Sequence, residues 1–433
     1  LRSFGGYTLP DFLAERFDRP GVRALAVLGV ILATFPAIAL TLLGLGVIAT
    51  RIFAIDLATG VAFGAVLLLA CSFAAGMRSA SLTQIVQYAV LLAAALVASA
   101  LLLAQHGTLL PAREGAGLQA LATIAFDALA VEDKPNRVAL LFCLAAGIAV
   151  LPHLLLRSMV TPSIEGARGS FLWAIPFTAA LCLVGVPALA LLGETPAATG
   201  ANLPLLAFGF AALGAIAALL ALGSGLLVTL ANTLSYDLYY KAVQPAASTG
   251  HRIFAARTAL VAVTSLAAWA ALARPDIVHA ATPAAFSFAA STLLPALLLG
   301  IWWKRASGEG ALAGMLAGLA VCLYYMLAPR YFPFAFYETS SFLSNATGAE
   351  AARYGELRQS FYLADETARA SALAAWEETA RAIANWGGIK RVFAAIFAVP
   401  LGLLTMIGVS LFTPAPAREV QALVEELRKP SAA

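Results

Sequence analysis

Charged residues are scarce in this sequence. Only 12% of its 433 residues are Asp, Glu, Lys or Arg, whereas 61% are hydrophobic and the mean hydropathy is +0.87. Globular domains have about 25% charged residues, and a soluble fold of this length cannot bury so much apolar surface. The composition therefore excludes a soluble protein and indicates a polytopic membrane protein, which uses lipid as part of its solvent.

Cysteine pairs, clustered basic residues and several catalytic motifs are also missing. The four cysteines, Cys71, Cys143, Cys182 and Cys322, lie in apolar runs without CxxC or Cys/His spacing, so no metal or redox site is expected. No nucleotide-binding loop, HExxH or GxSxG motif occurs, which removes the usual signatures of ATPases and hydrolases. Basic residues are scattered along the chain. We therefore expect no enzyme activity, no cofactor and no nucleic-acid partner.

Ten segments are long and apolar enough to cross a bilayer as helices, which takes about 20 residues for about 30 Å of hydrocarbon. They are Ala24–Thr50, Leu57–Met77, Leu82–Ala104, Val138–Leu156, Phe171–Leu192, Leu203–Tyr236, Thr258–Ala273, Ile277–Trp303, Ala311–Ala328 and Val392–Phe412. Leu203–Tyr236 is too long for one straight span. None shows the alternating polarity of a membrane barrel, so the predicted fold class is all-α.

The remaining segments divide the chain into a membrane part and two appendages. We expect a single transmembrane domain over residues 1–433, with a helical insertion outside the membrane at 330–390 and a tail at 413–433. The stretch Ala364–Ile383 is rich in alanine and mixes acids with bases, which is typical of a solvent-facing helix. The chain begins at Leu1 without a signal peptide, and we interpret it as a fragment.

The placement of basic residues predicts the orientation. If the N-terminal segment is inside, the inner loops collect most of the Lys and Arg residues, and the short outer loops hold only Arg51 and Arg274. Short loops rich in Lys and Arg stay in the cytoplasm. We therefore expect a multi-pass protein of the cell inner membrane, with the N-terminal segment and the C-terminal tail cytoplasmic and the 330–390 insertion extracytoplasmic.

Prolines fall inside several of the expected spans. They are Pro36, Pro152, Pro176, Pro187 and Pro295. A proline removes a backbone hydrogen bond and can kink or break a helix, and many transporters use broken helices to present backbone groups to an ion or a substrate. Since prolines are common in membrane helices, a packing role is expected for most of the five.

Five motifs follow one another along the chain. They are GGYTLPDFLAERF (Gly5–Phe17), GMRSASLTQIVQ (Gly76–Gln87), LPHLLLR (Leu151–Arg157), LSYDLYY (Leu234–Tyr240) and LLGIWWKRASGEGALAGMLAG (Leu298–Gly318). Taken together they resemble the sodium:solute symporter family over essentially the whole chain. LPH followed by an arginine resembles the acetate and monocarboxylate permease branch of that family.

The last hundred residues of the chain carry three further motifs. They are FYETSS (Phe336–Ser341), IANWGGIK (Ile383–Lys390) and SLFTPAPAREVQ (Ser410–Gln421). These are similar to a bacterial subgroup of the family that is often encoded beside a small two-helix membrane protein. The resemblance implies that such a subunit is a candidate partner, in addition to a small organic anion and the lipid bilayer.

The family resemblance implies a leucine-transporter-like fold. Its core has ten helices in two inverted five-helix repeats, and substrate and sodium lie near the midplane where helices are broken. In the family, the GYTLPDFL-type loop follows the second core helix, so the first two core helices are expected to be missing from this chain. The first of them normally supplies half of the main sodium site and part of the substrate site.

The positions that matter most for sodium depart from the family pattern. By resemblance, the other half of the sodium site falls on a hydroxyl pair, here Ala221 and Leu222, and on a backbone carbonyl at Ala218. Sodium needs oxygen ligands, which methyl groups cannot supply. Ser224 is about 200° around the helix from that pair. Similarly, Ile148 replaces a threonine of the branch, and the Asn, Tyr and Trp of the sugar-transporter branch are missing, which disfavours a sugar.

The candidate substrate path rests on the few polar or helix-breaking residues within spans: Ile148, Pro152, His153, Asn232 and Ser291. An ionisable group inside the membrane marks a functional site by default, although a neutral His153 bonded to a carbonyl freed by Pro152 needs no such role, and we favour that structural interpretation. Asn232 and Ser291 belong to polar patches that either join helices or line an aqueous path.

Other residues have simpler expected roles. Asp237 precedes Lys241 by four residues, which predicts an ion pair at a helix end rather than a proton carrier. Gln84 and Gln87 form another polar patch. Gly314 and Gly318 are expected to line a helix-packing face.

The sequence thus predicts secondary active transport of a small organic solute, expected to be a monocarboxylate, by sodium-coupled symport. The alternative is a truncated or degenerate relative without sodium coupling, acting as a facilitator or a receptor-like module. Ala221, Leu222 and Ile148 favour the alternative, whereas the retained motifs and full-length spans oppose it.

Overall fold

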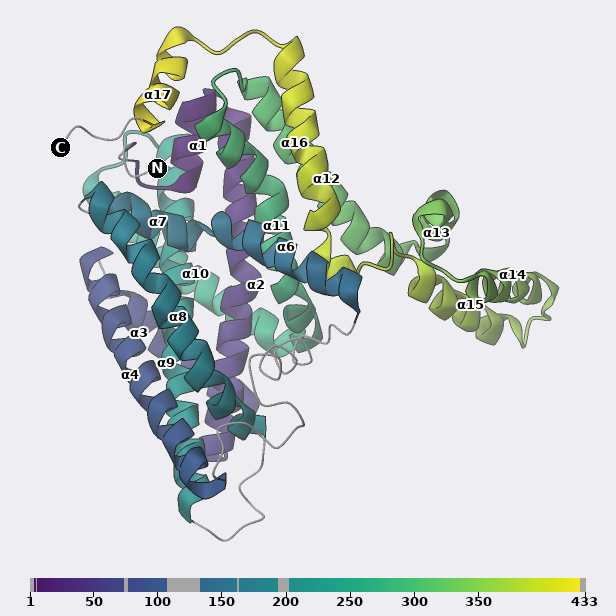
Figure 1. Ribbon diagram of the computed structural model, residues 1–433, viewed down its shortest axis with the longest axis horizontal. Helices are drawn as coiled ribbons and strands as arrows, with labels where there is room; N and C mark the ends of the chain where they lie inside the picture. Colours follow the sequence, from purple (N-terminus) through teal and green to yellow (C-terminus); the bar gives the residue numbers. More distant parts are fainter. Residues whose placement is uncertain are drawn as a thin grey trace.

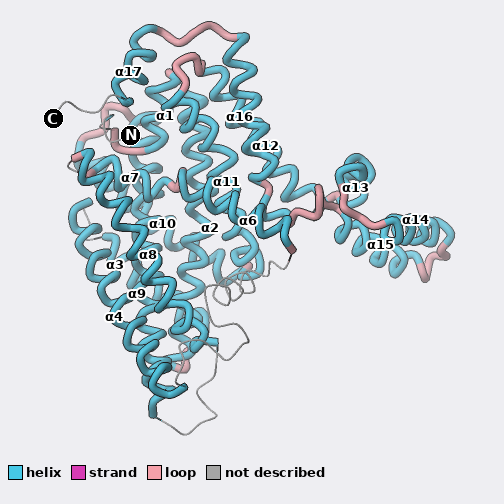
Figure 2. The backbone as a smooth tube through the Cα atoms, viewed as in Figure 1, coloured by secondary structure: helices cyan, strands magenta, loops and turns pink. Residues whose placement is uncertain are grey.

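The chain is helical throughout the residues that the structure describes. The computed structural model describes residues 4, 6–73, 77–106, 133–161, 163–193 and 202–428. Figure 2 shows helices joined by short loops, and no strand occurs in these ranges. The predicted all-α class is confirmed.

The helices follow one another in this order. They are α1 (Leu9–Phe17), α2 (Pro20–Phe53), α3 (Leu57–Phe73), α4 (Met77–His106), α6 (Lys134–Ala149), α7 (Pro152–Val160), α8 (Ile164–Gly193), α9 (Asn202–Asn232), the π-helix η3 (Thr233–Val243), α10 (Thr249–Ala273), α11 (Pro275–Trp302), α12 (Gly308–Tyr331), α13 (Pro333–Ser340), the short 3₁₀ turn η4 (Ser341–Leu343), α14 (Gly348–Leu363), α15 (Arg369–Ile383), a second 3₁₀ turn η5 (Arg391–Phe393), α16 (Ala395–Phe412) and α17 (Arg418–Arg428).

Each of the ten expected spans coincides with one or two of these helices. Among the described residues, eight stretches are long and apolar enough to cross a membrane. The other two expected spans are α3, which is apolar but has only 17 residues, and Phe171–Leu192 within α8, whose side chains from Cys182 onward lie outside the described residues. The expected spans are therefore helices, and eight of them meet the length and hydropathy that crossing requires.

The first motif folds into a capped helix. The Thr8 side chain accepts a hydrogen bond from the backbone N–H of Asp11, and Pro10 occupies the first turn, where its missing N–H costs nothing. The helix ends at Asp18, which has a left-handed backbone with φ of 47°, and Pro20 then begins α2. The string TLPDFLAERFDRP thus encodes a short helix and a tight turn into the long α2.

Helix α2 is the centre of the bundle (Figure 1). It packs against α3, α9, α10 and α11, and its buried side chains face all of these neighbours. Helices α4, α8 and α9 pack together on one side, and α12 and α16 form a pair on the other, with α11 between that pair and α2. The core is a set of helix interfaces lined by Ala, Leu and Val, including Ala26, Leu42 and Leu227, all fully buried.

Glycines let α12 approach its neighbours closely. A Cβ on Gly314 would lie 2.6 Å from the Met406 Cβ and 2.7 Å from the Gly402 carbonyl oxygen, both on α16. A Cβ on Gly318 would overlap the carbonyl oxygen of Ser291 on α11. Small residues at helix interfaces permit this backbone contact, so the packing role predicted for Gly314 and Gly318 is confirmed.

The 330–390 segment forms a helical hairpin that projects from the side of the bundle (Figure 1). Helices α13, α14 and α15 build it, and α14 begins with a capping box in which Thr347 and Glu350 bond each other's backbone N–H. The hairpin has a small core of its own, formed by Tyr337, Tyr354, Trp376, Ala380 and Ile383. The segment expected to be an insertion is therefore a separately packed unit.

The C-terminal tail turns back over the bundle. The Arg305 guanidinium donates to the Thr413 carbonyl oxygen at 2.6 Å, just after α16 ends. Helix α17 packs against α1 and α11, and Glu425 of α17 pairs with Lys304 at the end of α11. Figure 1 shows α17 lying beside α1.

Candidate functional site

A helix break separates α6 from α7. Helix α6 ends at Ala149, and Val150 has a non-helical backbone with φ of −120° and ψ of 10°. Pro152 then occupies the first position of α7, where it lacks an N–H to bond the preceding turn. Pro36 and Pro295 lie inside helices that continue through them. The break expected from the prolines therefore occurs at Pro152.

The residues around the break differ in exposure. Ile148, at the end of α6, is 46% exposed, whereas Pro152 is buried and His153 is 7% exposed. The Nδ1 of His153 has no hydrogen-bond partner among the described residues. Gly147 packs its backbone directly on Phe286 of α11, where a Cβ would lie 2.9 Å from the Phe286 carbonyl oxygen. The broken segment is thus held against the bundle core.

The positions assigned to sodium by resemblance lie in the middle of α9 and do not converge. Ala221 is 6% exposed, and its carbonyl oxygen accepts a hydrogen bond of 3.2 Å from the Gln84 Nε2 of α4. Leu222, the next residue, is 46% exposed. Adjacent side chains of a helix are about 100° apart, so Leu222 points away from the interior that Ala221 faces. Ala218 is half-buried one turn earlier. These positions therefore offer sodium no hydroxyl pair, and the Ala221 carbonyl oxygen already accepts a hydrogen bond.

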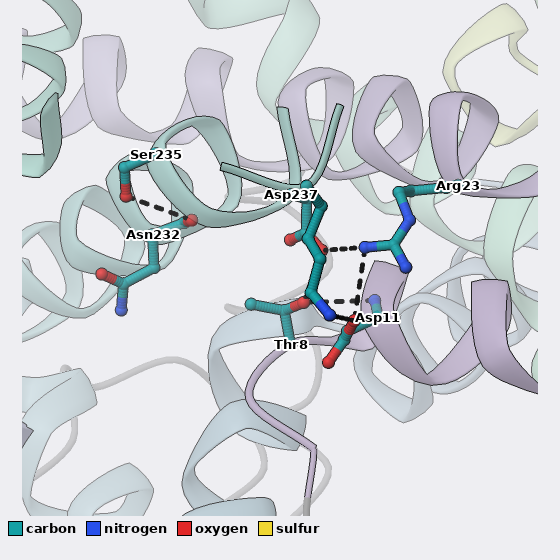
Figure 3. Close-up of polar contacts among 7 residues, drawn as sticks. Thr8, Asp11, Arg23, Asn232, Ser235 and Asp237 are labelled. Atoms are coloured by element: carbon teal, nitrogen blue, oxygen red, sulfur yellow. Dashed lines mark hydrogen bonds and ion pairs between the residues drawn. The ribbon is translucent and has the colours of Figure 1, made fainter. Parts of the chain in front are cut away.

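Asn232 and Ser291 lie elsewhere. Ser291 is fully buried on α11 where its backbone meets Gly318 of α12. Asn232 ends α9, and its carbonyl oxygen accepts from the Ser235 hydroxyl at 3.3 Å. Figure 3 shows both Asn232 and Ser235 apart from the charged group around Asp237. The structure therefore does not gather the five predicted substrate-path residues into one site.

Two residues that the sequence analysis did not assign to a site converge on α9. Helix α7 packs against α9, and a Cβ on Gly225 would lie 3.3 Å from the Arg157 Nη2 and 3.1 Å from the Gln84 Nε2. Arg157 closes the LPHLLLR motif, and Gln84 lies within GMRSASLTQIVQ. The four-residue spacing of His153 and Arg157, which places both on one helix face, was the available signal in the sequence.

A second polar group ties α1 and α2 to η3 (Figure 3). The Thr8 hydroxyl donates to Asp237 Oδ1 at 2.9 Å. The Arg23 Nη1 lies 3.4 Å from the same oxygen and 3.3 Å from Asp11 Oδ1, and the Lys241 Nζ lies 3.9 Å from that Asp11 oxygen. The Asp237 side chain is fully buried. Three segments far apart in sequence thus share one charge network.

The predicted pairing of Asp237 with Lys241 needs correction in its partners. The four-residue spacing predicts a pair on an α-helix, but Thr233–Val243 is a π-helix, in which the backbone bonds residues five apart. Asp237 forms its ion pair with Arg23, while Lys241 lies beside Asp11. The expected helix-end ion pair exists, and it joins η3 to α1 and α2.

Replacing Asp237 by alanine is expected to destabilise the protein by about 2 kcal/mol, because the Thr8 hydroxyl and Arg23 lose a buried charged acceptor. Lys241→Ala is the matched control. Its side chain is 38% exposed and its ion pair is long, so the expected loss is below about 1 kcal/mol. Thermal unfolding of both purified variants in detergent measures the difference. Equal losses would contradict the assignment of Asp237 as the centre of the network.

Several known proteins resemble this chain in sequence. The family model of the sodium:solute symporter family matches residues 1–318. An uncharacterized symporter of Cupriavidus necator is 29% identical over 99% of this chain and 81% of its own length. An uncharacterized symporter of Bacillus subtilis is 30% identical, and a monocarboxylic acid transporter of Corynebacterium glutamicum is 26% identical. These alignments cover 75% and 76% of this chain, and 67% of each relative.

A solved structure has the same fold. The substrate-bound outward-open state of a sodium-coupled sialic acid symporter superposes with a TM-score of 0.60 and 17% identity, covering 96% of this chain and 79% of that one. This likeness confirms the fold that the resemblance implied. With eight apolar spanning helices among its described residues, the protein is a multi-pass membrane protein. It belongs to the sodium:solute symporter family.

Proposed function

We propose that the protein carries out secondary active transport of a small monocarboxylate by sodium-coupled symport. Family membership supports the symport, and the relative from Corynebacterium glutamicum, a monocarboxylic acid transporter, supports the substrate class. The observation that carries the proposal is the break between α6 and α7 at Pro152. A broken helix inside the membrane presents free backbone groups and the positive end of a helix dipole to an anion.

The break is placed where it can respond to a bound solute. Val150 at the break is fully buried in the core that also holds α1, α2 and α11, while α7 packs on α9. A solute held beside the break therefore contacts helices from both sides of the bundle. Alternating access needs this arrangement, since the two parts of the molecule move about the substrate.

A second candidate function is transport of the same solute without sodium coupling. The observation that favours it is the state of α9, where the Ala221 carbonyl accepts from Gln84 and Leu222 faces outward. Neither side chain supplies the oxygen that sodium requires. In this case the protein acts as a facilitator, and the solute moves only down its own gradient.

Uptake of labelled acetate or pyruvate into proteoliposomes separates the two functions. A tenfold inward sodium gradient is worth about 1.4 kcal/mol, so coupling of one ion per solute allows about tenfold accumulation. We expect accumulation above the external concentration with the gradient, and equilibration only when potassium replaces sodium. Equal uptake in both conditions would contradict sodium-coupled symport and support transport without coupling. No uptake above empty vesicles would overturn both.

The proposal extends to partners and placement. We propose that the protein lies in the cell inner membrane, with α17 on the cytoplasmic side and the α13–α15 hairpin outside, because basic residues gather near α1 and α17. Sodium is the proposed coupling ion, and a small two-helix membrane protein is the proposed partner. The three motifs that suggest this partner lie in the hairpin, in the segment that follows it, and in the residues from Ser410 to Gln421 that lead into α17.

A further inference from the structure

We infer that Arg157, Gln84 and Ser224 form a binding site for the carboxylate group of a small organic anion over Gly225 of α9. The inference rests on the proposed function for the class of its substrate. It adds the location at which the carboxylate binds and the residues that bind it. None of these residues is one of the positions assigned to sodium by resemblance.

The geometry starts from Gln84. Its Nε2 donates to the Ala221 carbonyl oxygen at 3.2 Å and lies 3.5 Å from the Ser224 hydroxyl. The carbonyl fixes which end of the amide faces α9, because a carbonyl oxygen only accepts. The same nitrogen lies 3.1 Å from the Cβ position of Gly225. The amide N–H₂ group of Gln84 is therefore oriented toward the glycine.

Arg157 approaches the same point from α7. Its Nη2 lies 3.3 Å from the Cβ position of Gly225, so the guanidinium and the Gln84 amide meet over one glycine. Only a hydrogen atom occupies that position, and a side chain there would push both groups away. The Ser224 hydroxyl lies beside them and donates to the Ala221 carbonyl oxygen at 3.3 Å, so the Arg157 guanidinium is the member of this group that has no acceptor among the described residues.

The chemistry of this group suits an anion. Guanidinium and amide N–H₂ groups donate hydrogen bonds and carry no acceptor on these nitrogens, and a guanidinium matches the two oxygens of a carboxylate. The positive charge of Arg157 attracts an anion, so this face of α9 presents a fixed positive charge to the solute.

The charge of Arg157 is not neutralised by the described part of the chain. No carboxylate pairs with its guanidinium there, although Arg157 lies within the spanning segment Lys134–Met159. Arg157 is the third residue from the C-terminal end of this segment, and an ionisable group within a span is a candidate for a substrate path. One turn earlier on α7, His153 is 7% exposed and its Nδ1 also has no partner among the described residues.

The site is deep at one end and open at the other. Gln84 and Ser224 are 6% and 4% exposed, whereas Arg157 is exposed. An anion can therefore reach the guanidinium first and then replace the Ala221 carbonyl oxygen as the acceptor for the buried Gln84 amide and the Ser224 hydroxyl. A carboxylate group takes its place over Gly225 only when the exposed Arg157 side chain moves off the glycine, and the rest of a small monocarboxylate then extends past Arg157.

Binding of labelled acetate to the purified full chain in detergent, without any gradient, tests the site. We expect Arg157→Gln and Gly225→Ala each to weaken acetate binding about tenfold or more, and Arg157→Lys to weaken it less because it keeps the charge. Acetamide, which has no negative charge, is expected not to compete. The matched controls are Arg168→Gln, an exposed arginine of α8, and Gly209→Ala, an α9 glycine with nothing near its Cβ position.

The outcomes decide between this site and the broader function. Unchanged acetate affinity in both Arg157→Gln and Gly225→Ala would overturn the site even if transport is normal. Acetate binding that depends on Arg157 without uptake into vesicles would overturn only the proposed transport. If Gly225→Ala fails to fold, as judged by gel filtration, the comparison of Arg157→Gln with Arg157→Lys still decides. A wild-type chain that binds no acetate overturns the site.

Discussion

Replacing Gly318 by valine is expected to prevent the chain from folding. A Cβ at this position would overlap the carbonyl oxygen of Ser291 and lie 3.1 Å from its carbonyl carbon. Both atoms belong to the backbone of α11, which cannot rotate aside as a side chain can. Because α12 is also held against Gly402 and Met406 of α16, the helix cannot shift away without opening a second interface. We expect a loss above about 4 kcal/mol.

The matched control is Gly408→Val. Gly408 lies on α16, and its Cβ position has nothing within 4 Å. Valine is a slightly better helix former than glycine, so stability should change by less than about 1 kcal/mol. Yield after gel filtration in detergent and thermal unfolding compare the two variants. A well-folded Gly318→Val protein with normal thermal stability would show that α11 and α12 do not pack as closely as the structure has them.

The number and type of helices could be predicted because the membrane dominates the sequence. Crossing requires apolar runs without charge, and a run such as Ala311–Ala328 has one possible structure in lipid. That a proline could break a span was also predictable, since proline lacks an N–H, but Pro36 and Pro295 share this property and lie inside continuous helices, so the sequence did not single out Pro152. The π-helix of Thr233–Val243 was not predictable. Its backbone pattern depends on contacts of η3 with α2 and α10, which no local pattern in LSYDLYY encodes.

The candidate site was less predictable because its members meet only in three dimensions. Gln84 and Ala221 are 137 positions apart and are joined by one hydrogen bond. Sequence analysis identified Gln84 as polar and Arg157 as a basic residue of an inner loop, but it could not place either on Gly225. Ser291 and Asn232, predicted from their polarity to line a pathway, lie at a helix contact and a helix junction, and their place on a substrate path stays a prediction.

The role of Arg16 was also not predictable from the sequence. By position it belongs to the basic residues that set the orientation, yet its side chain is fully buried. Its guanidinium donates to the carbonyl oxygens of Gly300, Trp303 and Ala306 at 2.8, 3.1 and 3.3 Å. Gly300 and Trp303 lie at the C-terminal end of α11, where helix carbonyls lack partners and the dipole favours a cation, and Ala306 lies in the turn that leads to α12. Burial lowers the pKa of Arg16 to about 10, so it stays charged at neutral pH.

Replacing Arg16 by methionine is therefore expected to cost about 3–4 kcal/mol. Methionine fills a similar apolar volume but leaves the carbonyl oxygens of Gly300 and Ala306 without the donor that Arg16 gives them, while the Trp303 carbonyl keeps the backbone N–H of Ala306. Each unsatisfied buried group costs about 1–3 kcal/mol. Water reaching the end of α11 recovers part of that cost. Arg16→Lys should fall between, because an ammonium keeps the charge but cannot reach three carbonyls with the same fork. Thermal unfolding in detergent measures all three proteins.

The matched control is Arg274→Met at the opposite end of the same helix. The Arg274 side chain is 58% exposed and pairs with Asp276, which is 64% exposed, so its loss should cost below about 1 kcal/mol. Arg16→Met should also loosen α1, because its guanidinium is one of the contacts that hold α1 to α11. We therefore expect the backbone amides of Leu9–Phe17 to exchange hydrogen faster in Arg16→Met than in the wild type, in addition to the loss of stability. Faster exchange confined to α11, with α1 still protected, would show that Arg16 caps α11 without anchoring α1.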